Sequence, residues 1–255
     1  MPDGVRQQAC LRFVPSHPTH TSIVFIDPGH GGLDPGGQGQ ATDGTSIPEK
    51  DVSLATARLL AALLLADGYP VVMSRDMDIT VANLTDSDLQ GGILTADAAR
   101  EEVLARASCA NTAKADVLVS IHFDAFEDPG IGGAETLYDD ARPFADRNQA
   151  LATLVQKAMV TQLTQAGWPV PDRGVTADSQ SGTPALTAEG DGYGHLLLLG
   201  PASDGWVEHP STMPACLVEP LFLTRPTEAD VAESPRGRQV MARALSQALE
   251  TYLAG

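Results

Sequence analysis

The 255-residue sequence is poor in cysteine, in basic residues and in long apolar runs. Its three cysteines are too scattered for a disulfide framework, and none forms a C-x-x-C pair. We expect Cys109, in a helix-like pattern, and Cys216, in a strand-like pattern, to be buried, reduced and structural thiols. No apolar run reaches the roughly 18 residues of a membrane-spanning helix, so the sequence predicts no membrane insertion.

Basic residues are scarce: 16 Lys and Arg stand against 33 Asp and Glu, which gives a formal net charge of -17 at pH 7. Nucleic-acid binding depends on contacts of Lys and Arg with phosphate, so this excess of acid argues against such a partner. Residues 1–21 lack the apolar core of a secretory signal, which leaves the export route open. Their sequence, rich in proline and histidine, predicts an irregular N-terminal arm before a single domain over residues 22–255.

Strand and helix patterns alternate along that domain. Strands are predicted at residues 21–27, 70–74, 115–123, 133–138, 194–200 and 214–223, and helices at residues 51–67, 98–113, 144–166 and 235–253. This alternation indicates an α/β three-layer sandwich, with a mostly parallel or mixed twisted sheet of about six strands and helices on both faces. In such sheets, functional sites lie beyond the carboxyl ends of the strands.

Two histidines follow predicted strands of this sheet. His30 lies three residues after a strand that ends at Asp27, inside the glycine-rich loop "GHGGLDPGGQG", and His122 ends the run "VLVSIH". Adjacent strands lie about 5 Å apart, so the two imidazoles can converge on one point. A pair of imidazoles is typical of a transition-metal site, and Zn²⁺ suits a set of nitrogen and oxygen ligands.

A catalytic zinc needs a third protein ligand, and Glu49 at the start of the first long helix is the best-placed carboxylate. Glu49 also has another interpretation. In the run "SIPE", Ser46 and Glu49 fit a capping box, in which the carboxylate reaches back to the amide of the N-cap residue. Spacing alone favours the cap, and each histidine alone is compatible with an ordinary hydrogen-bonding role. Composition and periodicity do not decide between these interpretations.

Seven motifs occur in a fixed order along the chain: "IVFIDPGHGGLDPGG", "PEKDVSLATARLLAALL", "GYPVVMSRDMD", "RASCANTAKADVLVSIHFDAF", "GGAETLYDD", "DRGV" and "PACLVEPLFLTRPTEAD". With them, residues 22–253 resemble the zinc-dependent N-acetylmuramoyl-L-alanine amidases of the type 3 catalytic domain. These enzymes cut the amide between N-acetylmuramic acid and L-alanine of the peptidoglycan stem peptide. The first motif and the "SIH" motif are specific, whereas each of the others is weak alone.

The resemblance implies one Zn²⁺ per chain, held by His30, Glu49 and His122, and it makes Glu219 the catalytic glutamate. It implies peptidoglycan as the substrate and action on the cell wall, in the extracellular or periplasmic space. We expect a monomer. Glu219 would act as general base and then general acid, and its place after the apolar run "ACLV" predicts partial desolvation and a raised pKa.

Four further residues are candidates for supporting the metal or lining the substrate groove. We expect Asp27 to orient the His30 loop by accepting a hydrogen bond from loop amides or from the imidazole. Arg75 falls where the family usually carries arginine, and we interpret it as structural, paired with acidic loops. Asp124 belongs to a Phe-Asp pair that replaces the family's usual Ala-Asn, and it can add a carboxylate near the metal. Trp206 either lines a substrate groove or caps the sheet edge.

The chain departs from the family at two further places. Pro220-Leu221-Phe222 follow Glu219 where a small or hydroxyl residue and Gly-Phe are usual, which stiffens the backbone there. Residues 200–213 form an insertion before the last strand. Three alternatives therefore stay open: a zinc amidase acting on another peptide-like amide, a non-catalytic zinc-stabilised module that binds the cell wall, and a metal-free scaffold in which Glu49 only caps its helix.

Overall fold

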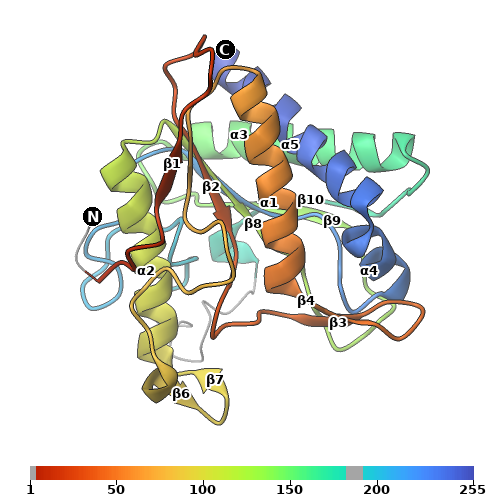
Figure 1. Cartoon of the computed structure of the whole chain (residues 1–255), viewed down its shortest axis with the longest axis horizontal. Helices are drawn as coiled ribbons and strands as arrows, with labels where there is room; N and C mark the ends of the chain where they lie inside the picture. Colours follow the sequence, from red (N-terminus) through yellow and green to blue (C-terminus); the bar gives the residue numbers. More distant parts are fainter. Residues whose placement is uncertain (1–3, 182–191) are drawn as a thin grey trace.

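The computed structural model describes residues 4–181 and 192–255 (Figure 1). Its centre is a seven-stranded mixed sheet with the order β1-β5-β2-β8-β11-β9-β10. The strands are β1 (Leu11–Phe13), β2 (Val24–Pro28), β5 (Val71–Met73), β8 (Val117–Ile121), β9 (Ala134–Tyr138), β10 (Asp172–Ala177) and β11 (Ala215–Glu219). Strands β5, β2, β8 and β11 are parallel, β1 and β9 are antiparallel to their neighbours β5 and β11, and β10 is parallel to β9.

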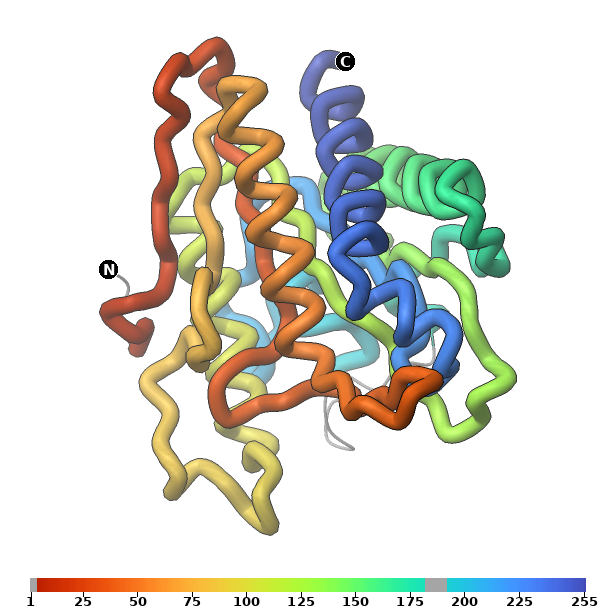
Figure 2. The backbone as a smooth tube through the Cα atoms, turned by 45° about the vertical axis from the view of Figure 1, so that its right-hand side comes forward, coloured from red at the N-terminus to blue at the C-terminus, as the bar shows by residue number. Residues whose placement is uncertain are grey.

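Helices cover both faces of this sheet, which confirms the predicted α/β sandwich. One face carries α1 (Glu49–Ala66), α3 (Ala145–Gln165), α4 (Pro226–Glu233) and α5 (Pro235–Ala254), and the other carries α2 (Ala96–Ala113). Figure 2 shows α5 between α1 and α3, and α5 contacts both. Val24 and Ile26 of β2 face this helical group, whereas Phe25 faces α2, and all three are fully buried. Burial on both faces explains why the central strands are continuous apolar runs.

Two short hairpins precede the first two helices. β3 (Gln38–Gln40) pairs with β4 (Ser46–Pro48) before α1, and β6 (Leu89–Gln90) pairs with β7 (Ile93–Leu94) before α2. Further 3-10 turns lie at Asp86–Asp88 and Asp178–Gln180. Within the described ranges, no helix has both the length and the apolar character needed to cross a bilayer.

The N-terminal segment is not irregular throughout, because β1 extends the edge of the sheet by pairing with β5. Next to β1, Cys10 forms a disulfide with Cys109 of α2, with 5.5 Å between their Cα atoms. The prediction of a reduced Cys109 is therefore wrong, whereas Cys216 is a buried free thiol as predicted. The bonded cysteines are 99 residues apart, so no local spacing could indicate their pairing. The domain boundary at residue 22 stays a prediction.

Three other local predictions differ from the structure. Residues 194–200 form turns instead of a strand, with Leu198 and Leu199 buried on the α2 side of the sheet. Strand β10 occupies Asp172–Ala177, where the sequence predicted no strand. In α1, helical periodicity predicts Leu59 and Leu63 on the buried face, but both are only partly buried, whereas Leu60 and Leu64 are fully buried. The run of leucine and alanine there is apolar on all sides, so periodicity could not define the buried face.

Candidate metal and catalytic centre

The carboxyl ends of three neighbouring strands bring the predicted site residues together. The loop after β2 carries His30, His122 directly follows β8, and Glu219 is the last residue of β11. Glu49 is the first residue of α1. Because β2, β8 and β11 are parallel neighbours, side chains far apart in the sequence meet at one edge of the sheet.

Glu49 lies between the two imidazoles. Its Oε2 is 3.0 Å from His30 Nε2, and its Oε1 is 3.0 Å from His122 Nδ1. The backbone amides of Gly37 and Phe123 donate to these oxygens at 2.8 and 3.0 Å. One ligand atom from each of the three side chains lies within 4.8 Å of the others. This cluster of His30, Glu49 and His122 is called the first cluster below.

The capping box that competed for Glu49 does not form. Ser46 belongs to β4, Pro48 stands at the N-cap of α1, and no side chain caps that helix. Glu49 instead occupies the first helical position, where the positive end of the helix dipole favours a carboxylate. Its side chain points away from its own helix end toward the histidines, so the local interpretation of this carboxylate is wrong.

The charges of the first cluster balance one another. Burial disfavours the charged form of His30, but Glu49 and Asp34 outweigh burial and raise the pKa of His30 to about 10. Burial also acts to raise the pKa of Glu49, but the two imidazoles outweigh it and hold that pKa well below its usual range. A positive charge is thus favoured at the centre of the cluster. Two imidazole nitrogens and one carboxylate oxygen are a donor set that suits Zn²⁺.

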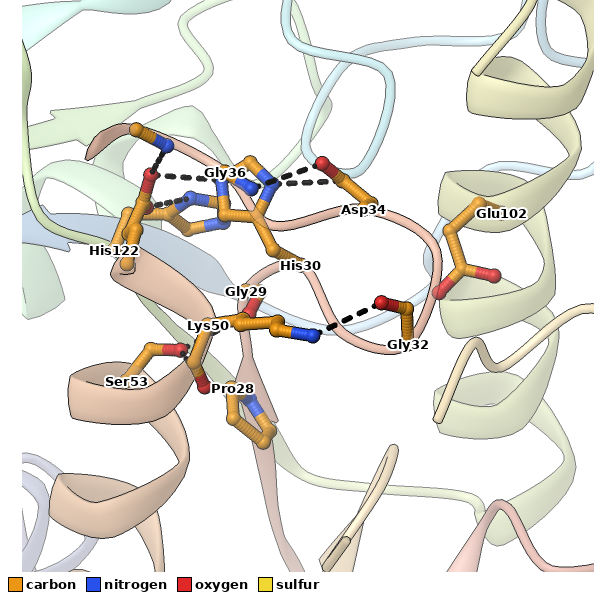
Figure 3. A network of polar contacts seen from close by, with 12 residues as sticks. Pro28, Gly29, His30, Gly32, Asp34, Gly36, Lys50, Ser53, Glu102 and His122 are labelled. Carbon is orange, nitrogen blue, oxygen red and sulfur yellow. Dashed lines mark hydrogen bonds and ion pairs between the residues drawn. The ribbon is translucent and has the colours of Figure 1, made fainter. Parts of the chain in front are cut away.

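Asp34, which the sequence analysis did not single out, orients His30. Its Oδ2 lies 2.7 Å from His30 Nδ1 (Figure 3). The opposite ring nitrogen, Nε2, therefore faces Glu49. Ligating histidines usually donate their second ring N–H to such a carboxylate. Gly36 has φ +67, and a Cβ there would lie 2.6 Å from His30 Cδ2 and 2.7 Å from Glu49 Oε2. The loop can pass this close to both side chains because residue 36 is glycine.

Asp27 supports the His30 loop through an arginine. Neither loop amides nor an imidazole donate to Asp27 in the described structure, contrary to the expectation; it accepts two serine hydroxyls and pairs with Arg106 at 2.7 Å. Arg106 donates to the carbonyls of Pro28 and His30 at 2.8 and 2.7 Å. This guanidinium is buried and also pairs with Glu102 at 2.6 Å. A buried ionic network therefore holds the backbone on both sides of the glycine loop's first turn.

Arg75 is fully buried and holds the same loop through backbone contacts. It donates to the carbonyl of Gly29 at 2.8 Å and to that of Lys50 at 2.9 Å, which ties the loop to the first turn of α1. No carboxylate pairs with it among the described residues. Its placement is that of a structural residue, but its partners are carbonyls and not the acidic loops that we expected.

Glu219 carries a buried oxygen without a donor. Burial, and then the negative charges of Glu49, Asp124 and Glu135, raise the pKa of Glu219 well above its usual value. In the part of the chain that the structure describes, no group gives a hydrogen bond to its Oε2. A buried polar oxygen of this kind is costly unless a proton, a water or a cation meets it. The site therefore fits a bound cation with a water beside Glu219.

Two carboxylates flank Glu219. Glu135 lies opposite it on β9, and no signal in the sequence marked that residue. Asp124, half-buried, has its own pKa raised by burial and by the charges of Glu135 and Glu49. The extra carboxylate that the sequence predicted at position 124 thus lies near Glu219 and adds to the negative charge around it.

Trp206 lies apart from the first cluster. It stacks on Tyr193, with 6.1 Å between ring centroids, and lines a cavity of about 630 Å³ together with α2 residues such as Arg100. None of the cluster residues lines that cavity. A smaller cavity of about 80 Å³ lies against His30 and His122 and is walled by apolar side chains of α2 and of residues 196–198. The structure thus places Trp206 against α2, in a cavity separate from the one beside His30 and His122.

Comparisons with known proteins agree with this architecture. A sequence model of the N-acetylmuramoyl-L-alanine amidase family matches residues 24–251. The N-acetylmuramoyl-L-alanine amidase AmiC of Neisseria meningitidis serogroup B is 27% identical over 243 residues, which are 91% of this chain and 52% of AmiC. This chain spans about half the length of the curated relatives it matches.

Two solved structures share the fold. The crystal structure of an N-acetylmuramoyl-L-alanine amidase from Clostridium difficile 630 has a TM-score of 0.63 at 28% identity, and the match covers 92% of this chain and 97% of that one. The CwlD amidase of Clostridioides difficile, solved in complex with the GerS lipoprotein, has a TM-score of 0.68 at 22% identity and covers 92% of this chain and 99% of its own.

Proposed function

The chain belongs to the N-acetylmuramoyl-L-alanine amidase family, and from this premise we propose that it hydrolyses the amide between N-acetylmuramic acid and L-alanine in peptidoglycan. In this proposal His30, Glu49 and His122 hold one Zn²⁺, and Glu219 moves the proton. The observation that carries it is the buried, unpartnered Oε2 of Glu219 beside a His-Glu-His set. A scaffold without a metal would leave that oxygen unexplained.

Hydrogen bonds to neighbouring groups orient the proposed ligands for binding a cation. Asp34 accepts the Nδ1 proton of His30, so Nε2 is the nitrogen that would give up its proton to bind a metal. The amides of Gly37 and Phe123 fix the carboxylate of Glu49 between the two rings. Zinc bound there would polarise the scissile carbonyl and lower the pKa of a water toward ~7.

Glu219 serves as the proton carrier. It accepts a proton from the attacking water as the oxygen adds to the amide carbon, and it donates that proton to the departing nitrogen as the C–N bond breaks. A carboxylate whose pKa is raised by burial and neighbouring charge holds the proton long enough for this second transfer. The products are the muramoyl carboxylic acid and the free amine of L-alanine.

The proposed substrate lies outside the cytoplasm, so we propose that the chain acts on the cell wall. The disulfide between Cys10 and Cys109 supports this location, because disulfides persist mainly in oxidising compartments outside the cytoplasm. All four proposed site residues come from one chain, which supports a monomer as the acting unit.

Release of stem peptides from purified peptidoglycan tests the proposal. We expect release by the wild type, loss after treatment with a chelator, and recovery on addition of Zn²⁺. Glu219→Ala should keep its zinc and lose activity by about 10²–10⁴-fold, because it removes the proton carrier alone. Glu127→Ala, a change at an exposed glutamate, is the matched control and should retain full activity.

Three results would contradict parts of the proposal. Loss of zinc in Glu219→Ala would make Glu219 a ligand and not the proton carrier. A wild type that holds one zinc at the first cluster but releases no stem peptide would be a binding module. Cleavage of other peptide-like amides with no release from muramoyl-peptides would assign the same site to another substrate.

A further inference from the structure

A second cluster of metal-ligating side chains lies at the opposite edge of the sheet. Asp139 and Asp140 directly follow β9, and Asp178 directly follows β10, the parallel neighbour of β9. Strand β9 runs antiparallel to β11, so these strand ends point away from the edge that carries the first cluster. His195, from the turns at residues 192–200, joins them, and one ligand atom from each residue lies within 4.8 Å of the others.

In each of the two buried carboxylates of this second cluster, one oxygen accepts hydrogen bonds from backbone amides and the other faces His195. Asp139 Oδ1 accepts two backbone amides of the turn after β9, at 2.8 and 3.1 Å, while its Oδ2 lies 3.0 Å from His195 Nδ1. Asp178 Oδ2 accepts the amide of Leu196 at 2.8 Å, while its Oδ1 lies 3.2 Å from the same Nδ1. Both inner oxygens and one imidazole nitrogen therefore face a common point.

The side chains around this point offer too few N–H hydrogens to satisfy both inner carboxylate oxygens. His195 Nδ1 carries at most one hydrogen, so it can donate to only one of the two inner oxygens, Asp178 Oδ1 or Asp139 Oδ2. Asp139 is fully buried, yet its Oδ2 receives no hydrogen bond from any described residue. The guanidinium of Arg142 does not supply one, because it donates to backbone carbonyls of residues 199, 200 and 211. A buried carboxylate oxygen thus points into the cluster with no hydrogen-bond donor of its own, next to an imidazole nitrogen that it shares with Asp178.

The charges of the second cluster are only partly compensated. Burial and the negative charge of Asp178 raise the pKa of Asp139 to about 6, against the opposing effect of His195. Burial raises the pKa of Asp178 as well, again against the effect of His195. Two buried carboxylates are kept close together here although the charge of Asp178 disfavours the ionised form of Asp139. A cation between them would remove that conflict.

We propose that Asp139, Asp178 and His195 bind a second divalent cation of the Zn²⁺ class, with Asp140 available as a fourth ligand from the surface. Zinc ligands at about 2.0–2.1 Å in a tetrahedron stand about 3.3 Å apart, close to the separations of 3.0 and 3.2 Å seen here. The imidazole favours zinc over calcium, which prefers ligand sets made only of oxygen. The ion would fix residues 192–200, which include part of the wall of the cavity beside His30 and His122.

Zinc content tests this site directly. The full-length protein is stripped with a chelator, titrated with Zn²⁺ alone, and assayed for bound zinc per chain. We expect two zinc ions in the wild type and one in Asp139→Asn or His195→Ala. Asp139→Asn keeps an oxygen for the backbone amides of the turn and replaces only the inner oxygen by an amide group. Asp204→Asn, which neutralises an exposed acid in the same part of the chain, should still bind two.

A second experiment starts from a variant that leaves the second cluster intact. Its zinc content therefore does not depend on whether variants of the second cluster fold. The double variant with His30→Ala and His122→Ala should bind one zinc, and adding His195→Ala to it should abolish binding. One zinc in the wild type and none in the double variant would overturn the proposal. So would two zinc ions in both Asp139→Asn and His195→Ala. Because the readout is metal content, the result is separate from whether the chain hydrolyses peptidoglycan.

Discussion

The first cluster lies at one edge of the sheet and the second cluster at the other, and their construction is similar. Each follows the carboxyl ends of two adjacent parallel strands, β2 and β8 in the first and β9 and β10 in the second. Each combines imidazole with carboxylate and fixes its carboxylates with backbone amides. They differ in proportion: the first has two imidazoles around one carboxylate, and the second has three carboxylates around one imidazole.

That difference in proportion changes how the groups titrate without a metal. In the first cluster the pKa of His30 is raised and the pKa of Glu49 is lowered, so the charged forms stabilise each other. In the second cluster the pKa values of Asp139 and Asp178 are both raised, because burial disfavours both ionised carboxylates and the charge of Asp178 adds to this for Asp139. The comparison teaches that similar strand-end geometry can give a cluster whose charges balance or one whose carboxylates are only partly compensated.

The largest effect is expected from two separate variants, each of which removes one carboxylate from one of the clusters. Both are measured in the presence of a chelator. Glu49→Gln should lower the free energy of unfolding by about 2–4 kcal/mol, below the usual loss for a fully buried pair because His30 can give up its proton. Asp139→Asn should leave that free energy unchanged or raise it, since it removes a charge that burial and the neighbouring Asp178 disfavour. Urea unfolding measures both changes.

Asp51→Asn, at an exposed position in the same turn of α1 as Glu49, provides the control and should shift the free energy by less than about 1 kcal/mol. If Glu49→Gln and Asp139→Asn both destabilised the metal-free protein by similar amounts, the two clusters would not differ in charge balance. The contrast drawn from the pKa directions would then be wrong.

The sequence could predict the first cluster because its signals are local. Apolar strands that end at a glycine-rich loop and at "VLVSIH" were enough to place His30 and His122 at one edge of the sheet. Glu49 was ambiguous, because the capping signal spans three residues whereas the contact that decides its role is to His122, 73 residues further on. Long-range contacts settle such a choice, and spacing does not reveal them.

The sequence could not predict the second cluster, for a related reason. Strand β10 contains Arg173 and Gly174, lies at the sheet edge and is only partly buried, so it lacks the apolar run that marked the central strands. Without β10, nothing places Asp178 beside Asp139. The disulfide between Cys10 and Cys109 was missed for the same reason, because the pairing of β1 with β5 is what brings the two cysteines together.

A smaller effect is expected from Asp34, the residue that orients His30 in the first cluster. Asp34→Asn leaves an oxygen that can accept the Nδ1 proton of His30 but removes the charge that strengthens this hydrogen bond. Outer carboxylates of this kind typically contribute about 10–100-fold to metal affinity, so zinc binding at the first cluster should weaken by that factor. Competition with a chelator measures it, and Asp43→Asn in the neighbouring exposed turn is the control. Equal weakening at both clusters would show a general effect on the fold.

The smallest effect concerns the close approach of the glycine loop. Gly36 and Gly44 both have positive φ, at +67 and +90, so alanine at either position costs about 1–2 kcal/mol of backbone strain. A Cβ at Gly36 would contact His30 and Glu49, whereas at Gly44 it would meet nothing within 4 Å. Both variants should therefore lose similar stability, but only Gly36→Ala should weaken zinc binding at the first cluster, by about tenfold, while zinc at the second cluster is unchanged. Equal zinc affinities in the two variants would mean that the loop can move aside, and that the glycine at position 36 serves the turn alone.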